Sequence, residues 1–233
     1  MGASPNSGDR PLTCSGYFER QARTRGFFRV AGVDEVGRGC LFGPVFAAAV
    51  ILDPTRPVRG LRDSKQLDPD RRQVLAARIR ERALAWAVAS VEARRIDEVN
   101  ILQASRLAMK QAVERLAPGP DYVLVDAIAL DVAAPQQALI HGDARCFSIA
   151  AASILAKVDR DECLRRWDEV YPQYGLAQHK GYATPEHLRA LAAHGPSDEH
   201  RFTFEPVALA VPPGAEPPAG RRMQLSLFAA EAR

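Results

Sequence analysis

The chain has 233 residues, enough for one domain, and 47% of them are hydrophobic, which excludes a wholly disordered protein. No apolar run reaches the roughly 18 to 20 residues that cross a bilayer, and the first residues lack the basic start and apolar centre of a signal peptide. The net charge of +3 permits a polyanionic partner without requiring one. The four cysteines are dispersed, which fits a reducing compartment, so we expect a cytoplasmic protein.

The predicted elements begin with hairpin strands and continue as alternating strands and helices. Two β-rich runs, 27–37 and 43–52, surround a Gly-Pro turn. Residues 85–93 alternate between apolar and polar and predict a third strand. The remaining elements are predicted as helices at 68–84, 96–117, 147–171 and 184–195 and as short strands at 122–130 and 137–144.

This order of elements predicts a mixed α/β sheet with helices on its faces. The last helix has clear boundary signals, with Thr184 as N-cap and Gly195 as C-cap. Gly, Pro and Ser are frequent at both ends of the chain. We therefore expect a flexible tail at 1–16, a folded catalytic part at 17–208 and a second flexible tail at 209–233.

Four acids stand at or near the ends of predicted apolar segments: Asp34, Glu35, Asp126 and Asp143. A buried unpaired carboxylate costs several kcal/mol, and few basic residues lie in these segments. Carboxylate oxygens suit Mg²⁺ or Mn²⁺ rather than zinc, and four of them could hold two such ions. An acid taken alone after a strand is usually a turn former or a helix cap, so position alone makes the metal site a hypothesis.

Several longer motifs occur in order between about residues 28 and 208: GVDEVGRGCLFGPVFAAAVIL, DSKQL, DEVNIL, GDARCFSIAAASILAKVDRDE and YGLAQHKGYATPEHLRALAAHGPSDEHRFTFEPV. Together they resemble bacterial ribonuclease HII. The resemblance implies a ribonuclease H-like fold, a mixed five-stranded sheet flanked by helices, with a small C-terminal helical extension. It also implies an endonuclease that hydrolyses the RNA strand of RNA/DNA hybrids. Single ribonucleotides in duplex DNA would be cut on their 5′ side, leaving 3′-hydroxyl and 5′-phosphate ends, in ribonucleotide excision repair.

The resemblance also assigns roles to residues. It implies that two divalent ions, Mg²⁺ or Mn²⁺, bind to the catalytic acids Asp34, Glu35, Asp126 and Asp143. It implies that Gly37, Arg38 and Gly39 lie over the minor groove, where their backbone reads the ribose 2′-hydroxyl, and that Tyr182 stacks on the following sugar. Glycines let a backbone approach a sugar closely, and the 2′-hydroxyl distinguishes RNA from DNA. Without the resemblance, the loop is an ordinary β-turn and Tyr182 a core anchor.

The same motifs hold four weaker candidates for phosphate contacts: Lys65, Asn100, Arg160 and Lys180. Exposed basic residues are more often simply solvated. One position departs from the family, which usually has glycine after the third acid where this chain has Ala127. Asp131 is the only nearby competitor for the role of Asp126, and we prefer Asp126 because it ends the apolar run.

The segment QLSLF, residues 224–228, resembles the peptide by which bacterial repair proteins bind the sliding clamp. Gln224 would enter a polar pocket, and Leu227 with Phe228 would fill an apolar one. The Pro/Gly-rich stretch at 212–222 suits a tethered peptide. The alternatives are a tail that packs on the domain itself and an accidental match.

Two other functions remain open at this point. One is a ribonuclease HIII-like nuclease that prefers longer RNA tracts; the Gly-Arg-Gly motif and the absence of a large N-terminal extension favour type HII. The other is a clamp-associated module that binds hybrids without cutting them, against which the four acids argue. We expect a monomer whose partners are RNA/DNA hybrid and ribonucleotide-containing duplex DNA, with no membrane.

Overall fold

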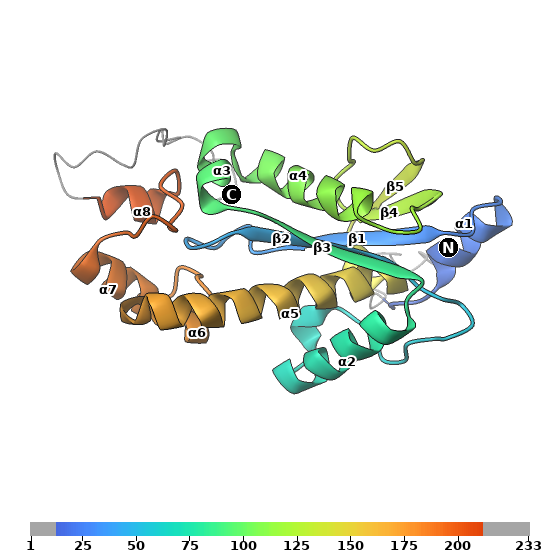
Figure 1. The fold of residues 1–233 in the computed structure, drawn as a ribbon, viewed down its shortest axis with the longest axis horizontal. Helices are drawn as coiled ribbons and strands as arrows, with labels where there is room; N and C mark the ends of the chain where they lie inside the picture. The colour runs from blue at the N-terminus through green and yellow to red at the C-terminus, as the bar shows by residue number, and fades with distance from the viewer. Residues whose placement is uncertain (1–12, 212–233) are drawn as a thin grey trace, which may run out of the picture.

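A five-stranded sheet in the order β3-β2-β1-β4-β5 forms the centre of the computed structural model, which describes residues 13–211 (Figure 1). Strand β2 is antiparallel to both of its neighbours, β1 and β3, whereas β4 runs parallel to both β1 and β5. The sheet is therefore mixed, as predicted. Its strands are β1 Val30–Val36, β2 Val45–Ile51, β3 Ala85–Val91, β4 Tyr122–Asp126 and β5 Gln136–Leu139.

Helices cover both faces of this sheet, and the shorter C-terminal ones gather at one end of the molecule (Figure 1). Helix α4 packs on one face, and α5 and α2 pack on the other. The helices are α1 Tyr17–Thr24, α2 Pro69–Arg82, α3 Ala93–Val99, α4 Ile101–Glu114, α5 Phe147–Val170, α6 Leu176–His179, α7 Pro185–His194 and α8 Glu205–Leu209. Within residues 13–211, no helix is long and apolar enough to span a membrane.

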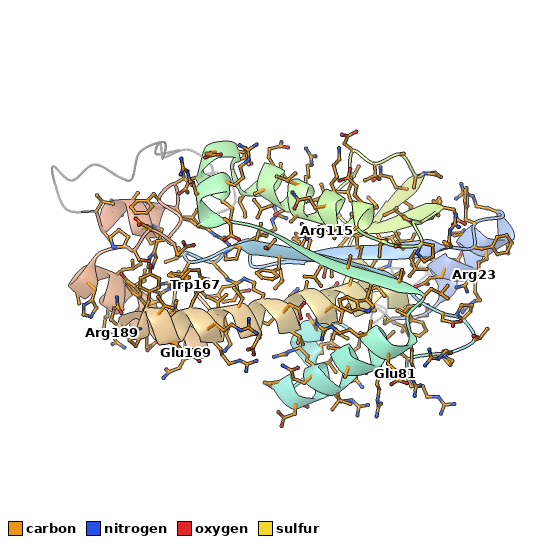
Figure 2. All side chains as sticks on the ribbon, viewed as in Figure 1. Arg23, Glu81, Arg115, Trp167, Glu169 and Arg189 are labelled. Carbon is orange, nitrogen blue, oxygen red and sulfur yellow. The ribbon has the colours of Figure 1, made fainter. Side chains whose placement is uncertain are left out.

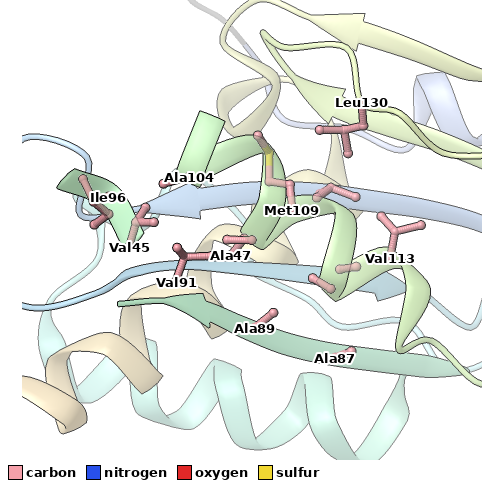
Figure 3. Close-up of a cluster of buried hydrophobic side chains, with 14 of the residues drawn as sticks. Val45, Ala47, Ala87, Ala89, Val91, Ile96, Ala104, Met109, Val113 and Leu130 are labelled. Atoms are coloured by element: carbon pink, nitrogen blue, oxygen red, sulfur yellow. The ribbon is translucent and has the colours of Figure 1, made fainter. Parts of the chain in front are cut away.

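Small residues let the helices approach the sheet closely. Figure 3 shows Met109 and Val113 of α4 packed over strands that present alanines such as Ala47 and Ala87. On the other face, a Cβ at Gly32 would lie 2.1 Å from the carbonyl carbon of Ser148 in α5. Only glycine fits there, so β1 and the start of α5 are in direct backbone contact.

The long helix predicted at 96–117 is wrong, because the chain forms α3 and α4 with a break at Asn100. Asn100 has a φ of +71°, and its side chain accepts a hydrogen bond from the Gln103 N–H at 3.0 Å. Asparagine tolerates the left-handed region and caps helices well, so it ends one helix and starts the next. The strand predicted at 122–130 is also too long, because it stops at Asp126 where Ala127 takes a φ of +54°.

The boundaries of α7 are confirmed, since the Thr184 hydroxyl accepts the His187 N–H and Gly195 follows the last turn. Helix α1 was not predicted. Its Glu19 accepts the Ser148 N–H at 2.7 Å and so satisfies a donor at the start of α5.

The three-part division of the chain stays a prediction, and the predicted clamp peptide with Gln224, Leu227 and Phe228 lies outside the described residues.

Candidate active site

The four predicted acids meet where β1, β4 and the short helix η2 Gly142–Ala144 come together. Val33 of β1 pairs with Val125 of β4 in parallel register, and the next residue on each strand is an acid, Asp34 or Asp126. Oδ1 of Asp126 accepts the Gly142 N–H at 2.7 Å, which ties η2 and its Asp143 to the end of β4. The parallel pairing of β1 and β4 therefore brings acids 92 positions apart side by side.

Burial and mutual repulsion act on these carboxylates. Asp34 is only 5% exposed, and burial, followed by the charges of Glu35 and Asp126, raises its pKa well above its ordinary value. The Ser153 hydroxyl of α5 acts in the opposite direction. Burial also raises the pKa of Glu35 and of Asp143. Ser153 was not predicted as a site residue; its signal in the sequence is a polar side chain within an Ala-rich helix.

Two cations lie against the acids. Nη1 of Arg38 is 3.3 Å from Oε1 of Glu35, and Nζ of Lys65 is 3.8 Å from Oδ2 of Asp143. The expectation that few bases neutralise the acids locally is therefore incomplete. Arg38 is three residues beyond Glu35 in sequence, whereas Lys65 reaches Asp143 from η1 Ser64–Gln66. Neither contact was predicted from the sequence, because both depend on how the loops fold over the sheet.

The chemistry of these residues fits hard divalent cations, since all four side chains offer carboxylate oxygens. Oε2 of Glu35 is buried and has no hydrogen-bond partner among the described residues. As the side chains stand, however, no group of three His, Cys, Asp or Glu residues within 13–211 could hold an ion. One oxygen of Asp34 and one of Asp143 accept the next backbone N–H, of Glu35 and Ala144, at 2.8 and 2.9 Å.

The predicted recognition residues lie beside one another. Cys40, directly after the Gly-Arg-Gly motif, forms an isolated antiparallel bridge with Tyr182. Gly37 is buried with a φ of +92°, whereas a Cβ at Gly39 would meet no atom within 4 Å. The Tyr182 side chain is 40% exposed. The structure thus offers an open glycine and an exposed aromatic ring on adjoining segments.

The weaker candidates for phosphate contacts have different surroundings in the structure. Arg160 is fully buried and hydrogen-bonds to backbone carbonyls, so its prediction as a phosphate contact is wrong. Asn100 caps α4, and Nζ of Lys180 donates to the Ala177 carbonyl. The competing acid Asp131 is paired with Lys110 at 2.7 Å.

Positive charge is spread over the surface of the protein. Figure 2 labels Arg23, Arg115 and Arg189, which belong to α1, the end of α4 and α7 at separate places on the molecule. Overall charge therefore does not define a nucleic-acid interface.

Comparison with known proteins places the chain among nucleases. The family model described as ribonuclease HII matches residues 31–207. Ribonuclease HII of Solibacter usitatus is 66% identical over 204 residues, covering 85% of this chain and 90% of that protein. Ribonuclease HII of Koribacter versatilis is 52% identical over 202 residues, covering 87% and 80%.

Solved structures agree with the fold. The ribonuclease H2 of Pyrococcus horikoshii is 27% identical with a TM-score of 0.68, over 78% of this chain and 96% of that one. The ribonuclease HII in a complex with PCNA from Archaeoglobus fulgidus is 27% identical with a TM-score of 0.60, over 70% and 85%. A ribonuclease HIII (Bst-RNase HIII) solved with Mn²⁺ is 22% identical with a TM-score of 0.66, over 89% and 75%, and shows the fold alone.

Proposed function

Since this chain belongs to the ribonuclease HII family and is an endonuclease of the ribonuclease H type, we propose that it cuts 5′ of single ribonucleotides in duplex DNA. We also propose that it hydrolyses the RNA strand of longer RNA/DNA hybrids. Both reactions leave 3′-hydroxyl and 5′-phosphate ends, and the first is the incision step of ribonucleotide excision repair.

One observation carries this proposal: the acid cluster runs directly into the Gly-Arg-Gly loop, which we propose reads the sugar. Glu35 is followed after one residue by Gly37, and Arg38 in that loop donates back to Glu35 at 3.3 Å. The groups that act on the phosphodiester and the groups that contact the ribose are therefore neighbours. A nuclease that cuts 5′ of a ribonucleotide needs this proximity, because the phosphate that it cuts is attached to the 5′-oxygen of the same ribose whose 2′-hydroxyl must be recognised.

Ribonucleases H depend on divalent metal ions, and we propose that two, Mg²⁺ or Mn²⁺, are held by Asp34, Glu35, Asp126 and Asp143. When bound, such ions lower the pKa of water and stabilise the charge that develops on a leaving oxygen. The protein keeps the four carboxylates close on the rigid ends of β1 and β4 and on η2. Lys65 and Arg38 balance part of their charge until ions and phosphates arrive.

Substrate recognition is proposed for the adjoining segments. The space beside Gly39 admits a sugar edge, and the exposed Tyr182 ring provides a face on which the next sugar stacks. Lys65, with its side chain 83% exposed, is proposed to contact a phosphate. Asn100 is proposed as a further polar contact to the backbone of the duplex.

We propose that the chain also docks on the sliding clamp through Gln224, Leu227 and Phe228. An archaeal ribonuclease HII has been solved with PCNA, which supports clamp association for this kind of enzyme. The test is a pull-down with purified clamp, using the full chain and a chain that lacks residues 224–233. We propose that the enzyme is cytoplasmic and monomeric.

The decisive experiment is a cleavage assay in Mg²⁺ on three matched duplexes: all-DNA, DNA with one ribonucleotide, and uniform RNA/DNA hybrid. The proposal expects cutting 5′ of the single ribonucleotide and no cutting of the all-DNA duplex. Activity restricted to the uniform hybrid would indicate a ribonuclease HIII-like preference. Binding without cutting of any duplex would indicate a non-catalytic module.

A further inference from the structure

Arg160 of α5 touches both segments that we assign to ribose recognition, although it is itself fully buried. Its Nη1 donates to the Lys180 carbonyl at 3.0 Å, two residues before Tyr182. Its Nη2 and Nε lie 3.4 Å from the carbonyls of Phe42 and Pro44, in the segment that follows the Gly-Arg-Gly motif. One side chain thus reaches two stretches of backbone that are about 140 positions apart.

The two glycines that face Arg160 show how closely it is enclosed. A Cβ at Gly37 would lie 2.2 Å from Nε of Arg160, and a Cβ at Gly181 would lie 3.6 Å from its Nη2. The guanidinium carbon is 5.9 Å from the centroid of the Tyr182 ring. The guanidinium therefore fills the space between the Gly-Arg-Gly loop and the Tyr182 segment.

Arginine suits this position better than lysine. The guanidinium presents five N–H donors in a rigid plane, so it fixes several carbonyls at set directions, whereas an ammonium acts as a point charge on a flexible stem. The acceptors of Arg160 are all backbone carbonyls, so it fixes the course of the chain.

Two other buried side chains, Arg201 and Ser153, contact the Gly-Arg-Gly loop and the acids. Arg201, also fully buried, donates to the Arg38 carbonyl at 2.8 Å and to the Gly43 carbonyl at 3.0 Å. It holds the Gly-Arg-Gly loop, and neither of these bonds reaches the Tyr182 segment. Ser153, two turns before Arg160 on α5, acts on Asp34. Helix α5 thus contacts the acids, the loop and the Tyr182 segment, and Arg160 adds a buried side-chain connection between the last two beside the backbone bridge of Cys40 with Tyr182.

We infer that Arg160 is a positioning residue that fixes the Gly-Arg-Gly loop and Tyr182 at the spacing required to recognise a single ribonucleotide. The inference rests on the proposed function, because it assigns a substrate preference to the same site. A lone ribonucleotide must meet the loop and Tyr182 in one register. A uniform hybrid offers a 2′-hydroxyl at every position, so it tolerates a change in their spacing.

The test compares kcat/KM in Mg²⁺ on the single-ribonucleotide duplex and on the uniform hybrid for wild type and Arg160→Lys. Small misplacements in a reaction site cost up to about 100-fold. We expect a loss of about tenfold or more on the single ribonucleotide and of less than about threefold on the hybrid. Each variant is assayed at a temperature at which circular dichroism shows it folded, and Arg160→Gln replaces a lysine variant that does not fold.

Two further variants separate positioning from a general loss of stability. Met109→Ala, in the core on the other face of the sheet, lowers stability and should leave the ratio of the two kcat/KM values unchanged. In a Tyr182→Ala background, Arg160→Lys should change the single-ribonucleotide kcat/KM by less than about twofold, because its route of action is already removed.

The outcomes distinguish the inference from the function beneath it. A wild-type chain that does not cut the single-ribonucleotide duplex contradicts the proposed function. If wild type cuts it, equal losses of Arg160→Lys on both duplexes, or additive losses with Tyr182→Ala, overturn the inference alone.

Discussion

Nζ of Lys65 lies 3.8 Å from Oδ2 of Asp143, so a cation from η1 reaches the acid cluster. The Lys65 side chain is 83% exposed, and an exposed ion pair contributes at most about 1 kcal/mol to stability. Burial lowers the pKa of Lys65, but the attraction of Asp143 and the other nearby acids outweighs it and leaves the pKa raised. Lys65 therefore stays charged and is available to a phosphate.

Replacing Lys65 by methionine should weaken substrate binding and leave stability almost unchanged. We expect kcat/KM on a single-ribonucleotide duplex to fall roughly three- to tenfold, mostly through KM. The slope of log(kcat/KM) against log[salt] should become shallower by about 1, because one phosphate contact is lost. Lys110→Met is the matched control, since Lys110, which is on α4, is already paired with Asp131. An equal effect of both variants would contradict a specific role for Lys65.

Asp34→Asn should abolish cleavage and raise the melting temperature of the metal-free protein. The pKa of Asp34 is raised above that of the unfolded chain, so its ionised form destabilises the fold. Protonated Asp34 stabilises the fold at a pH below the ordinary pKa of aspartate. This stabilisation is lost as the pH rises through the raised pKa that Asp34 has in the folded protein. The gain in melting temperature should therefore appear at neutral pH and disappear at low pH. Retained cleavage would exclude Asp34 as a metal ligand.

Mg²⁺ should raise the melting temperature of wild type more than that of Asp34→Asn. The ion relieves repulsion among the carboxylates and binds the folded state by mass action. Differential scanning fluorimetry across millimolar Mg²⁺, with Na⁺ at matched ionic strength as control, measures this difference. Equal shifts for the two proteins would contradict a preformed acid cluster.

Gly37 and Gly39 should respond differently to alanine. At Gly37 the added Cβ meets Arg160 at 2.2 Å and the φ of +92° is strained, so Gly37→Ala should lower stability and activity together. At Gly39 the Cβ meets open space, so Gly39→Ala should keep the melting temperature within about 2 °C. It should still reduce cleavage at least roughly tenfold, because the Cβ enters the space proposed for the sugar. Full activity of Gly39→Ala would show that no substrate approaches there.

Ala127→Gly should stabilise the protein. Ala127 follows Asp126 with a φ of +54°, and a left-handed conformation costs an L-residue roughly 1–2 kcal/mol. Glycine removes that cost, but it increases the conformational entropy of the unfolded chain, which lowers stability by about 0.4–1 kcal/mol. The net gain should raise the melting temperature by about 1–3 °C. Ala129→Gly is the control: Ala129 lies outside the left-handed region, so that variant should lower the melting temperature.

A chain of hydrogen bonds connects the Tyr182 segment to the segment between α7 and α8. His200 Nδ1 accepts the Ser197 N–H at 3.0 Å, so its Nε2–H points to His187 Nε2, 3.2 Å away. His187 Nδ1–H then donates to the Tyr182 carbonyl at 3.0 Å. The His187 ring must be neutral for this chain, because a proton on its Nε2 would face the Nε2–H of His200.

Protonation of His187 should lower the stability of the protein as the pH falls. Burial lowers its pKa to about 4 from the ordinary 6.5, with a smaller contribution from His179, which stacks on it at 4.4 Å. Because the folded protein holds His187 neutral, its contribution to stability is fully present above about pH 6.5 and is lost as the pH falls towards about 4. The slope approaches about 1.4 kcal/mol per pH unit for one proton. Urea titrations of wild type and His187→Gln should differ most at neutral pH and converge near pH 4; parallel curves would contradict the prediction.

The sequence determined what local patterns encode. Alternating and helical apolar spacing predicted the five strands and the position of α5, because these patterns record which side of each element is buried. Asn100 marks where that approach failed, since apolar spacing continues through 96–117 although the backbone breaks. The capping preference of asparagine was the signal that could have divided the helix.

The tertiary structure decided which distant residues meet. The parallel register of Val33 with Val125 set Asp34 beside Asp126, and the folding of η1 brought Lys65 to Asp143. Packing also turned Arg160, a surface candidate in the sequence, into a buried link between two loops. Side-chain type and spacing specify what a residue can do within a turn or two of its neighbours. Its partners across the chain are fixed only when the whole core packs and each element has one allowed position.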